Sequence, residues 1–346
     1  MTIHTLLETL ARHDGASDLI LTVGVSPQLR IHREMIPLNH PELTDETMHR
    51  FCTDILSPQQ YETFEQCREY DFSYTLNDQF RFRINIFRQQ QHTAMVARII
   101  MDRVPDREKL RLPPAVEQLA QLTSGMVMLT GPTGSGKSTT LAAMIDYVNN
   151  HRACHIVCIE DPIEYIHHPV LSTINQREVG SDTDSYAEAL RRVLRQSPDV
   201  IVIGEIRDRD SAQAAVTLAE TGHLLLTTMH TRGAISAINR MIDLFPPEQT
   251  RQMRSQLASS LMGVIWQQLL PARDQDGLIL ACEIMIVTPA IRALIMNGNT
   301  HEIVSMLQTG RKFGMCTMEQ AITDLEQQQL IDGTSTQQKG LHPVGR

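Results

Sequence analysis

The 346-residue sequence contains no long hydrophobic run and no excess of basic residues. No apolar segment approaches the roughly 20 residues that a membrane-spanning helix needs, so we expect no transmembrane span. The first residues, MTIHTLLETLARHDG, lack the basic stretch and apolar core of a secretory signal. Ile3, Leu6, Leu7 and Leu10 instead have the spacing of an amphipathic helix. These absences predict a cytoplasmic protein.

The sequence also lacks the features of a zinc protein and of a non-specific nucleic-acid binder. Its six cysteines form no CxxC pair, and the two nearest, Cys154 and Cys158, lie on one predicted strand. We therefore expect reduced thiols and no structural zinc site. The formal net charge of −9 disfavours non-specific binding of nucleic acid, because phosphate contacts need a basic surface. A net charge of this sign leaves local basic patches open.

The pattern of apolar residues changes near residue 100, which predicts two domains. Residues 1–100 contain short β-like runs, and FRFRINIF at 80–87 alternates apolar and polar side chains as a half-buried strand does. A hairpin turn is expected before it at Asn77-Asp78. We expect a small α+β domain here and a charged, proline-bearing linker over 101–114. A tail without fixed structure is expected over 333–346.

Residues 115–332 alternate predicted strands with predicted helices. Apolar runs that are typical of strands occupy residues 126–131, 155–160, 200–205 and 223–230. This order predicts an α/β fold, with a parallel sheet wrapped by helices. A later helix is expected from the helical spacing of Met253, Leu257, Leu261, Val264 and Ile265. The remainder to about Ile331 is also expected to be helical.

A phosphate-binding loop follows the first of these strands. Its pattern is Gly131-x4-Gly136-Lys137-Ser138, in the strand–loop–helix context that the motif needs. The glycines let successive backbone N–H groups face a phosphate at a helix N-terminus. Lys137 is expected to reach the β- and γ-phosphates of ATP, and the Ser138 hydroxyl to ligate Mg²⁺. The predicted nucleotide-binding residues of the loop are Gly131, Pro132, Thr133, Gly134, Ser135, Gly136, Lys137, Ser138 and Thr139.

Polar residues stand at the ends of three other predicted strands of the same sheet. They are Glu160, Asp161, Glu164, Glu205, His223 and His230. Ligands of open parallel sheets bind beyond the carboxyl ends of the strands, where such residues gather. Taken singly, Glu205 could cap a helix, His223 could be a satisfied core histidine, and Asp161-Pro162 could start a turn. Their repetition after successive strands favours a site.

The sequence resembles the secretion ATPases, and within them the type IV pilus retraction ATPases (the PilT family), over almost its whole length. Four segments carry the resemblance, at 131–138, 160–164, 201–205 and 221–230. They resemble the family's Walker A loop, its acidic Asp box, its atypical Walker B segment ending in Gly-Glu, and its His box. The resemblance implies a PAS-like N-terminal domain, a RecA-like ATPase domain and a hexameric ring that retracts a pilus.

The resemblance also implies residue roles. Glu205 would assist metal binding and catalysis, and Glu164 would orient the attacking water. Arg83 and Arg98 are expected to sense the γ-phosphate, although an arginine on an exposed strand face is ordinarily a solvated charge. The remaining nucleotide-site residues implied by the Asp box and the His box are Glu160, Asp161, His223 and His230. The implied cofactors are ATP and Mg²⁺.

The resemblance further implies one partner, an inner-membrane pilus platform protein that is reached from the cytoplasmic face without membrane insertion. The absence of a four-cysteine zinc element favours retraction ATPases over extension ATPases. Three segments depart from the family pattern, namely HREM at 32–35, FRQQQH at 87–92 and AIRALIMN at 290–297. The last of them ends in Met296 and Asn297 where charges are usual. Two alternatives remain open, namely an accessory subunit of another motor and a RecA-like nucleic-acid translocase.

Overall fold

The structure, a computed structural model, describes all residues except 32–33, 78, 101–103, 106, 274–276 and 333–346. The chain divides into two compact units. One comprises Met1–Arg103 with Glu164–Ile166, and the other comprises Val104–Ile163 with His167–Arg346. The expected turn residue Asp78 and the expected tail from Gly333 lie outside the described residues. In the part of the chain that is described, no helix combines the length and the apolar character needed to cross a membrane.

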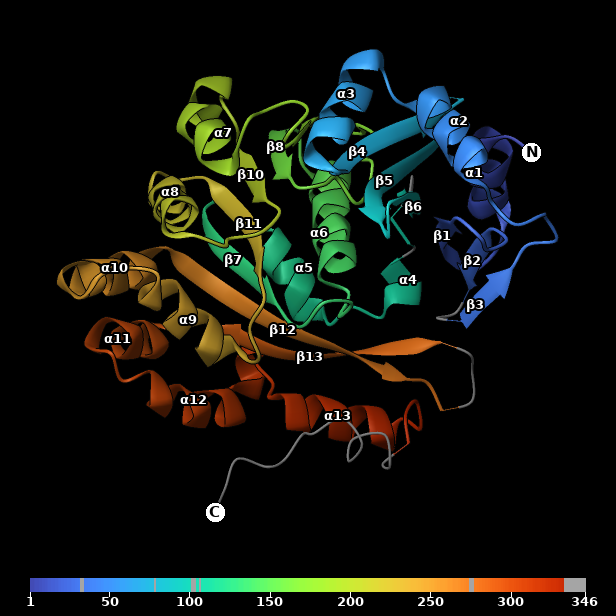
Figure 1. Cartoon of the computed structure of the whole chain (residues 1–346). Helices are drawn as coiled ribbons and strands as arrows, with labels where there is room; N and C mark the ends of the chain where they lie inside the picture. The colour runs from blue at the N-terminus through green and yellow to red at the C-terminus, as the bar shows by residue number, and fades with distance from the viewer. Residues whose placement is uncertain (32–33, 78, 101–103, 106, 274–276, 333–346) are drawn as a thin grey trace. The chain divides into compact units, whose positions relative to one another are not determined.

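The first unit contains a six-stranded antiparallel sheet with the order β3-β2-β1-β6-β5-β4 (Figure 1). Its strands are β1 (Ala16–Thr22), β2 (Gln28–Ile31), β3 (Glu34–Pro37), β4 (Glu69–Leu76), β5 (Phe80–Gln89) and β6 (His92–Ile100). Its helices are α1 (Ile3–Arg12), α2 (Asp45–Ile55) and α3 (Pro58–Cys67). Phe82, Ile84 and Ile86 of β5 are fully buried, so the predicted alternation of this strand is confirmed.

Helix α1 is also confirmed, and its local signals explain where it begins. The Thr2 side chain accepts a hydrogen bond from the Thr5 backbone N–H and so satisfies one of the unpaired donors of the first turn. The apolar residues at helical spacing, Ile3, Leu6, Leu7 and Leu10, are at most 1% exposed. They join the core of the first unit.

The second unit contains a seven-stranded sheet with the order β13-β12-β7-β11-β10-β8-β9. All neighbours in it are parallel except the antiparallel pair of β12 and β13. The strands are β7 (Gly125–Thr130), β8 (His155–Glu160), β9 (Thr173–Glu178), β10 (Val200–Ile203), β11 (Leu224–Met229), β12 (Leu261–Pro271) and β13 (Leu278–Ile286). The helices are α4 (Arg107–Leu110), α5 (Pro114–Ala120), α6 (Lys137–His151), α7 (Tyr186–Val193), α8 (Arg209–Glu220), α9 (Ala234–Asp243), α10 (Pro247–Ser260), α11 (Pro289–Asn297), α12 (Ile303–Thr309) and α13 (Met318–Gln327). Short 3₁₀ turns occupy Leu194–Gln196, Thr300–Glu302 and Gly310–Phe313.

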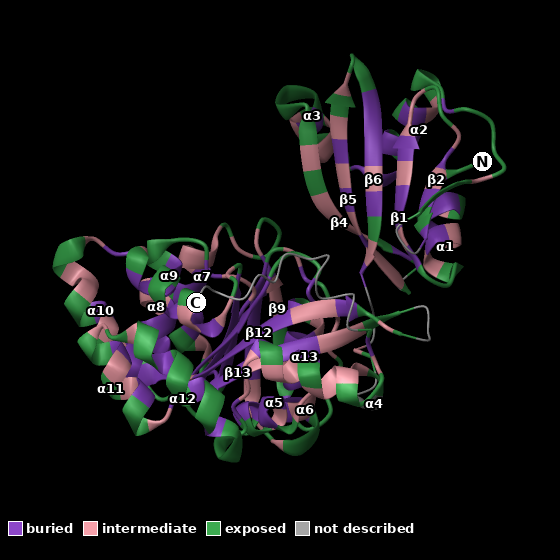
Figure 2. Ribbon diagram, turned by 90° about the horizontal axis from the view of Figure 1, so that it is seen from below, coloured by how far each residue is buried: buried purple, intermediate pink, exposed green. Residues whose placement is uncertain are grey.

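Helices cover both faces of this second sheet, which explains its continuous apolar strands. Alternate residues of a strand point to opposite faces. Met126 and Met128 of β7 therefore join one core with residues of α8 to α12, whereas Val127 and Leu129 join another with residues of α5 and α6. In Figure 2 the central strands of this unit are almost entirely buried, while the covering helices expose their outer faces. Strands buried on both faces read as unbroken apolar runs.

The predicted helix through Leu261, Val264 and Ile265 is wrong. Helix α10 ends at Ser260, and the residues from Leu261 form strand β12, which pairs with β7 and β13. The expectation of continuous helix to about Ile331 is wrong for β13 as well. A Cβ at Gly263 would lie 2.8 Å from the Leu119 side chain, so the close packing of α5 on β12 requires this glycine. The tertiary packing of α5, distant in sequence, therefore determines the conformation here.

Candidate active site

The phosphate loop turns between β7 and α6 through backbone conformations that need glycine. Gly131, Gly134 and Gly136 have φ values of 151°, 74° and 85°, in the region that residues with a Cβ rarely adopt. A Cβ at Gly131 would lie 2.5 Å from Ser135 Oγ and 2.6 Å from the Gln267 carbonyl oxygen. Helix α6 begins without a side-chain cap, so its first N–H groups face the loop. Such a helix N-terminus is suited to an anion.

Lys137 folds back over this loop. Its Nζ donates hydrogen bonds to the carbonyl oxygens of Gly131 (2.9 Å) and Pro132 (3.0 Å), and it lies 3.5 Å from His230 Nδ1. The side chain is buried, and burial lowers the pKa of the ammonium from its ordinary value, while the charge of Glu205 opposes that shift. A buried ammonium needs hydrogen-bond acceptors, and a bound phosphate would be a stronger one than a carbonyl.

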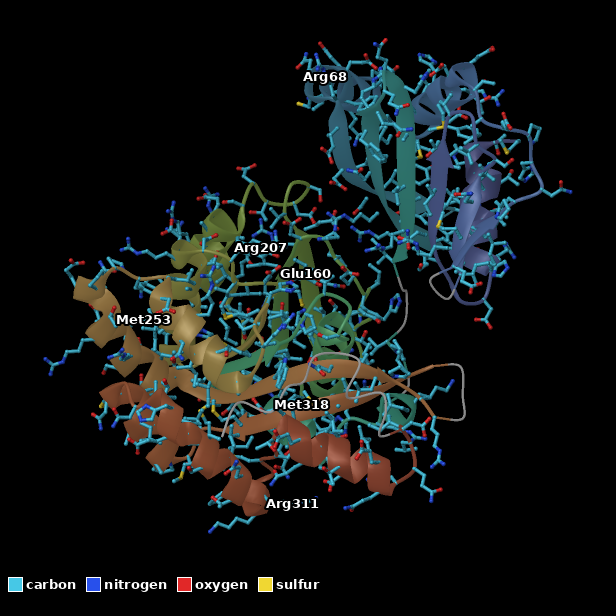
Figure 3. All side chains as sticks on the ribbon, turned by 60° about the horizontal axis from the view of Figure 1, so that its bottom comes forward. Arg68, Glu160, Arg207, Met253, Arg311 and Met318 are labelled. Carbon is cyan, nitrogen blue, oxygen red and sulfur yellow. The ribbon has the colours of Figure 1, made fainter. Side chains whose placement is uncertain are left out.

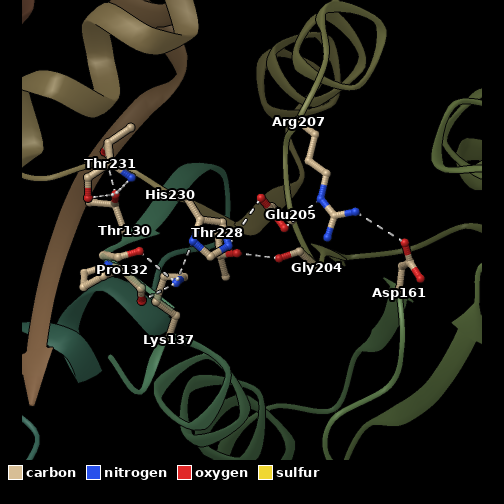
Figure 4. Close-up of polar contacts among 11 residues, drawn as sticks. Thr130, Pro132, Lys137, Asp161, Gly204, Glu205, Arg207, Thr228, His230 and Thr231 are labelled. Carbon is tan, nitrogen blue, oxygen red and sulfur yellow. Dashed lines mark hydrogen bonds and ion pairs between the residues drawn. The ribbon is translucent and has the colours of Figure 1, made fainter. Parts of the chain in front are cut away.

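Glu205 is held between His230 and Arg207 beside the loop (Figure 4). Its Oε1 lies 3.4 Å from His230 Nε2, and its Oε2 accepts a hydrogen bond of 2.8 Å from Arg207 Nε. Arg207 continues to Asp161, with 3.6 Å between its terminal nitrogen and Asp161 Oδ2. The polar chain from Lys137 through His230, Glu205 and Arg207 to Asp161 thus follows the carboxyl ends of β7, β11, β10 and β8. Figure 3 labels Arg207 and Glu160, which follow β10 and end β8.

The simpler explanation of Glu205 as a helix cap is wrong. Asp208 is the N-cap of α8, and its Oδ1 accepts a hydrogen bond of 2.8 Å from the Ser211 N–H. Glu205 lies three residues earlier and turns toward His230. Its side chain is 17% exposed, so it is largely withdrawn from solvent yet remains accessible to a ligand.

Packing explains why β10 is followed by glycine where phosphate-loop ATPases usually have aspartate. A Cβ at Gly204 would lie 2.9 Å from Tyr186 Oη and 3.3 Å from Glu160 Cα. The backbone of Gly204 is also fixed, because its N–H donates to the Ile159 carbonyl (2.8 Å) and its carbonyl accepts from Thr228 Oγ1 (2.6 Å). Position 204 has no room for a carboxylate. The carboxylate at the next residue, Glu205, points instead toward the phosphate loop.

Within this unit His223 lies away from the phosphate loop, and its assignment to the nucleotide stays a prediction. It precedes the amino end of β11, whereas His230 follows the carboxyl end. Its Nδ1 lies 3.2 Å from the Leu218 carbonyl oxygen and 3.1 Å from Thr221 Oγ1. Six residues of strand separate the two histidines, a distance of about 20 Å at roughly 3.3 Å per residue. Within this chain the half-buried His223 ring contacts the C-terminal end of α8.

The acidic residues at and beyond the carboxyl end of β8 have different environments. Glu160 is 9% exposed, and its Oε1 accepts a hydrogen bond of 3.1 Å from Gln176 Nε2. Asp161 pairs with Arg207, as described above, and Glu164 is exposed. Of these three, only Asp161 has a described link to the polar chain of the phosphate loop.

The two predicted arginine sensors belong to the first unit, where both pair with carboxylates. Arg98 Nε donates a hydrogen bond of 2.8 Å to Oδ1 of Asp18, a side chain that is only 4% exposed. Arg83 Nε lies 3.4 Å from Asp71 Oδ1. Arg98 and Arg83 are themselves 57% and 40% exposed.

Three residues near the loop were not predicted from the sequence. Thr130 is the last residue of β7. Its Oγ1 lies 2.6 Å from Thr231 Oγ1 and accepts a hydrogen bond of 3.0 Å from the Thr231 N–H. This contact fixes the residue after His230 to the start of the phosphate loop. Arg207 is the third, since its link between Glu205 and Asp161 depends on two strand ends coming together. The only sequence signal for it is a cation two residues after a strand-end carboxylate.

The chain matches the family of Type II/IV secretion system proteins over residues 75–331. It belongs to this family. The type IV pilus retraction ATPase PilT of Pseudomonas aeruginosa is 41% identical over 343 residues, which cover 99% of each chain. A twitching motility protein of Neisseria gonorrhoeae is 44% identical over 88% of this chain and 82% of its own length. A crystal structure of the pilus retraction motor PilT with bound ADP has a TM-score of 0.91 at 39% identity, and covers 99% of this chain and 98% of that chain.

These relatives confirm several predictions for this secretion ATPase. The predicted family is confirmed, as is the fold class of a RecA-like α/β domain with a smaller N-terminal α+β domain. The enzyme is an ATPase that binds nucleotide. The function predicted for it, pilus retraction, is the one named for the full-length relative of Pseudomonas aeruginosa, and the Neisseria gonorrhoeae relative is named for twitching motility. The roles of individual residues stay predictions.

The residues of this ATPase site fit a magnesium ion that is held mainly by the nucleotide. Among the described residues, no group of three His, Cys, Asp or Glu side chains is placed to hold a metal ion. The chain offers the exposed Ser138 hydroxyl in the first turn of α6 and the Glu205 carboxylate. Mg²⁺ commonly takes one or two protein ligands, phosphate oxygens and several waters. A sparse donor set of this kind suits it.

Proposed function

We propose that the chain is a subunit of a hexameric ring that hydrolyses Mg-ATP to drive type IV pilus retraction. The observation that supports this most directly is the polar chain from Lys137 through His230 to Glu205 at the carboxyl edge of the sheet. It connects the residue that holds the phosphates to the carboxylate that replaces the usual aspartate. The full-length similarity to a retraction ATPase supplies the biological process.

The residues of the phosphate loop would contact the phosphates of the nucleotide and its Mg²⁺ ion. The backbone N–H groups of 133–138 surround the β-phosphate, and Lys137 exchanges its two carbonyl acceptors for phosphate oxygens. Ser138 and Glu205 would hold Mg²⁺, which neutralises charge on the phosphates when it is bound. His230 holds Glu205 from the loop side, and Arg207 with Asp161 holds it from the other side. The carboxylate is thereby oriented before ATP arrives, which is the condition for electrostatic stabilisation.

The water-activating group in this proposal is Glu164, which acts as a general base. Arg83 and Arg98 act on the γ-phosphate from a neighbouring subunit, as arginine fingers supplied in trans do. Asp18, buried beneath Arg98, fixes the direction of that guanidinium. The ring is then needed for turnover, because one chain carries the phosphate loop and the next carries the arginines.

The proposed partner is an inner-membrane pilus platform protein, which the cytoplasmic ring contacts without inserting into the membrane. The N-terminal unit is proposed to be PAS-like. A second candidate function is supported by one observation. Met296 and Asn297 are exposed in the motif where charges are usual, and Met296 is 50% exposed. An accessory subunit that joins the ring of another motor would tolerate that change.

Complementation of a deletion strain separates these two candidates. The gene for the unaltered protein should restore pilus retraction, and a gene encoding Lys137→Ala should not. Lys312→Ala is the matched control. Lys312 lies in a 3₁₀ turn, and its Nζ is 4.9 Å from the centroid of the Phe313 ring. This control should restore retraction. Restoration by Lys137→Ala would favour the accessory subunit.

A further inference from the structure

The segment that carries Glu164 is fastened at both ends by side chains of strand β9. Strand β9 returns parallel to β8 at the edge of the sheet, with Glu160 opposite Glu178. At the first end of the segment, the Ile163 N–H donates a hydrogen bond of 3.1 Å to Glu178 Oε2. At the second end, the His167 N–H donates one of 2.9 Å to Gln176 Oε1.

Glu178 is itself fixed before it contacts the segment. It is 6% exposed, and its backbone N–H donates a hydrogen bond of 2.8 Å to Asp182 Oδ2. The Asp182 N–H returns a hydrogen bond of 2.8 Å to the Glu178 carbonyl oxygen. The carboxylate therefore extends toward Ile163 from a backbone that is fixed in a closed turn.

Gln176 is fixed in a similar way at the other end. Its amide oxygen accepts from His167, and its amide nitrogen donates to Glu160 Oε1 at 3.1 Å. Beyond His167, the buried Asn149 of α6 donates a hydrogen bond of 2.8 Å to the His168 carbonyl oxygen. Only the three residues 164–166 lie between the contacts at Ile163 and His167.

We propose that Glu178 and Gln176 are positioning residues, which act through the backbone at Ile163 and His167 to fix the place from which Glu164 works. This inference rests on the proposed role of Glu164 as the base. Each residue of chain spans at most about 3.5 Å, so a three-residue segment held at both ends leaves Glu164 little room to move. Misplacing a catalytic group by about 1 Å can cost a hundredfold in rate.

Burial supports a positioning role for Glu178 over a purely structural one. Removing a carboxylate from water is costly, and an apolar residue of similar size would pack at the edge of β9 without that cost. The carboxylate adds a directed acceptor for the Ile163 N–H. Glu178 lies opposite Glu160, the last residue of β8, and the segment that carries Glu164 begins just after Glu160.

The test compares variants that keep or remove this acceptor. Glu178→Leu should lower kcat at least about tenfold and leave the Kd for nucleotide unchanged, because the phosphate loop is not altered. Glu178→Gln keeps an amide oxygen for Ile163 and should stay within about threefold of the unaltered protein. Asn175→Leu is the matched control, since Asn175 lies on the same strand and its Oδ1 contacts His155 Nε2 at 2.7 Å instead of the segment. It should leave kcat unchanged.

Combining Glu178→Leu with Glu164→Gln shows whether one residue acts through the other. If Glu178 only positions Glu164, its loss should cost less than about twofold once the base is removed. A full kcat in Glu178→Leu, or an undiminished loss in the Glu164→Gln background, would overturn the inference. A Glu164→Gln variant that hydrolyses ATP at the parental rate would instead refute the proposed base, so the two failures are distinguishable.

A measurement on the unaltered protein covers the case in which Glu178→Leu does not fold. Amide hydrogen exchange should be slow at Ile163 and His167, because both N–H groups are held by fixed side chains. In the Gln176→Leu variant, exchange at His167 should quicken at least about tenfold while exchange at Ile163 stays slow. Fast exchange at both amides of the unaltered protein would overturn the inference.

Discussion

Adding a single methyl group at Gly204 tests the packing account of the missing aspartate. In Gly204→Ala the new Cβ would lie 2.9 Å from Tyr186 Oη, where ordinary contacts of this kind begin at 3.4 Å. The overlap is about half an ångström. The Tyr186 ring packs against the core of the second unit and cannot move away freely. Overpacking of this size costs about 1–3 kcal/mol in the free energy of unfolding.

The partner variant that relieves the overlap is Tyr186→Phe. It removes the Oη and leaves the longer contacts of 3.3 Å with Glu160 Cα and 3.4 Å with the Ile159 carbonyl oxygen. We therefore expect Gly204→Ala to cost less than about 1 kcal/mol in the Tyr186→Phe background, a coupling that a double-mutant cycle measures.

Urea unfolding of the four proteins, followed by far-ultraviolet circular dichroism, gives the required free energies. Thermal unfolding provides a second reading, with a fall of about 2–4 °C in Tm per kcal/mol for a unit of this size. An equal cost of Gly204→Ala in both backgrounds would show that Tyr186 does not exclude a side chain at this position. The same result would remove the explanation for the displacement of the carboxylate to Glu205.

Three further predictions concern the site and its support. Glu164→Gln should bind ATP normally and hydrolyse it at least about a hundredfold more slowly. Glu205→Gln should also hydrolyse ATP slowly, but with a shifted Mg²⁺ optimum. A shifted Mg²⁺ optimum in Glu164→Gln alone would reverse the roles assigned to Glu164 and Glu205. Arg98→Ala should lower turnover more than affinity, and mixing it with Lys137→Ala should restore activity; no recovery in intact hexamers would exclude action in trans. Burial, aided by His168, lowers the pKa of His167 to about 4 from 6.5, so stability should fall as the pH drops from 6.5 to 4. His167→Gln should flatten that slope in pH-dependent thermal unfolding, and an unchanged slope would assign it to other groups.

Local sequence was sufficient to predict the elements whose pattern is decisive over a few residues. The phosphate loop needs glycines at φ values that other residues avoid, so Gly131 and Gly136 are readable without any tertiary information. The strand at Val200–Ile203 is short, unbroken and buried on both faces, which is typical of a central parallel strand. These signals also located Glu205, because it follows the strand directly.

Long-range packing determined what the sequence did not reveal. Strand β12 was read as a helix because Leu257, Leu261 and Val264 happen to share helical spacing, and periodicity alone does not separate a buried strand from a buried helix. His223 and His230 were both assigned to the nucleotide, yet the strand between them places them at opposite edges of the sheet. The contacts of Gln176 and Glu178 depend on β9 returning beside β8, a pairing that no local pattern marks.

The central claim is that this chain hydrolyses ATP at the phosphate loop through Lys137, and steady-state turnover of the purified protein tests it most directly. With saturating Mg-ATP, the unaltered protein and the Lys312→Ala control should release phosphate at the same rate. Lys137→Ala should release none above background, because it lacks the charge that stabilises the transferred phosphoryl group, while its circular dichroism stays that of the folded protein. Phosphate release by Lys137→Ala at the parental rate would contradict the account.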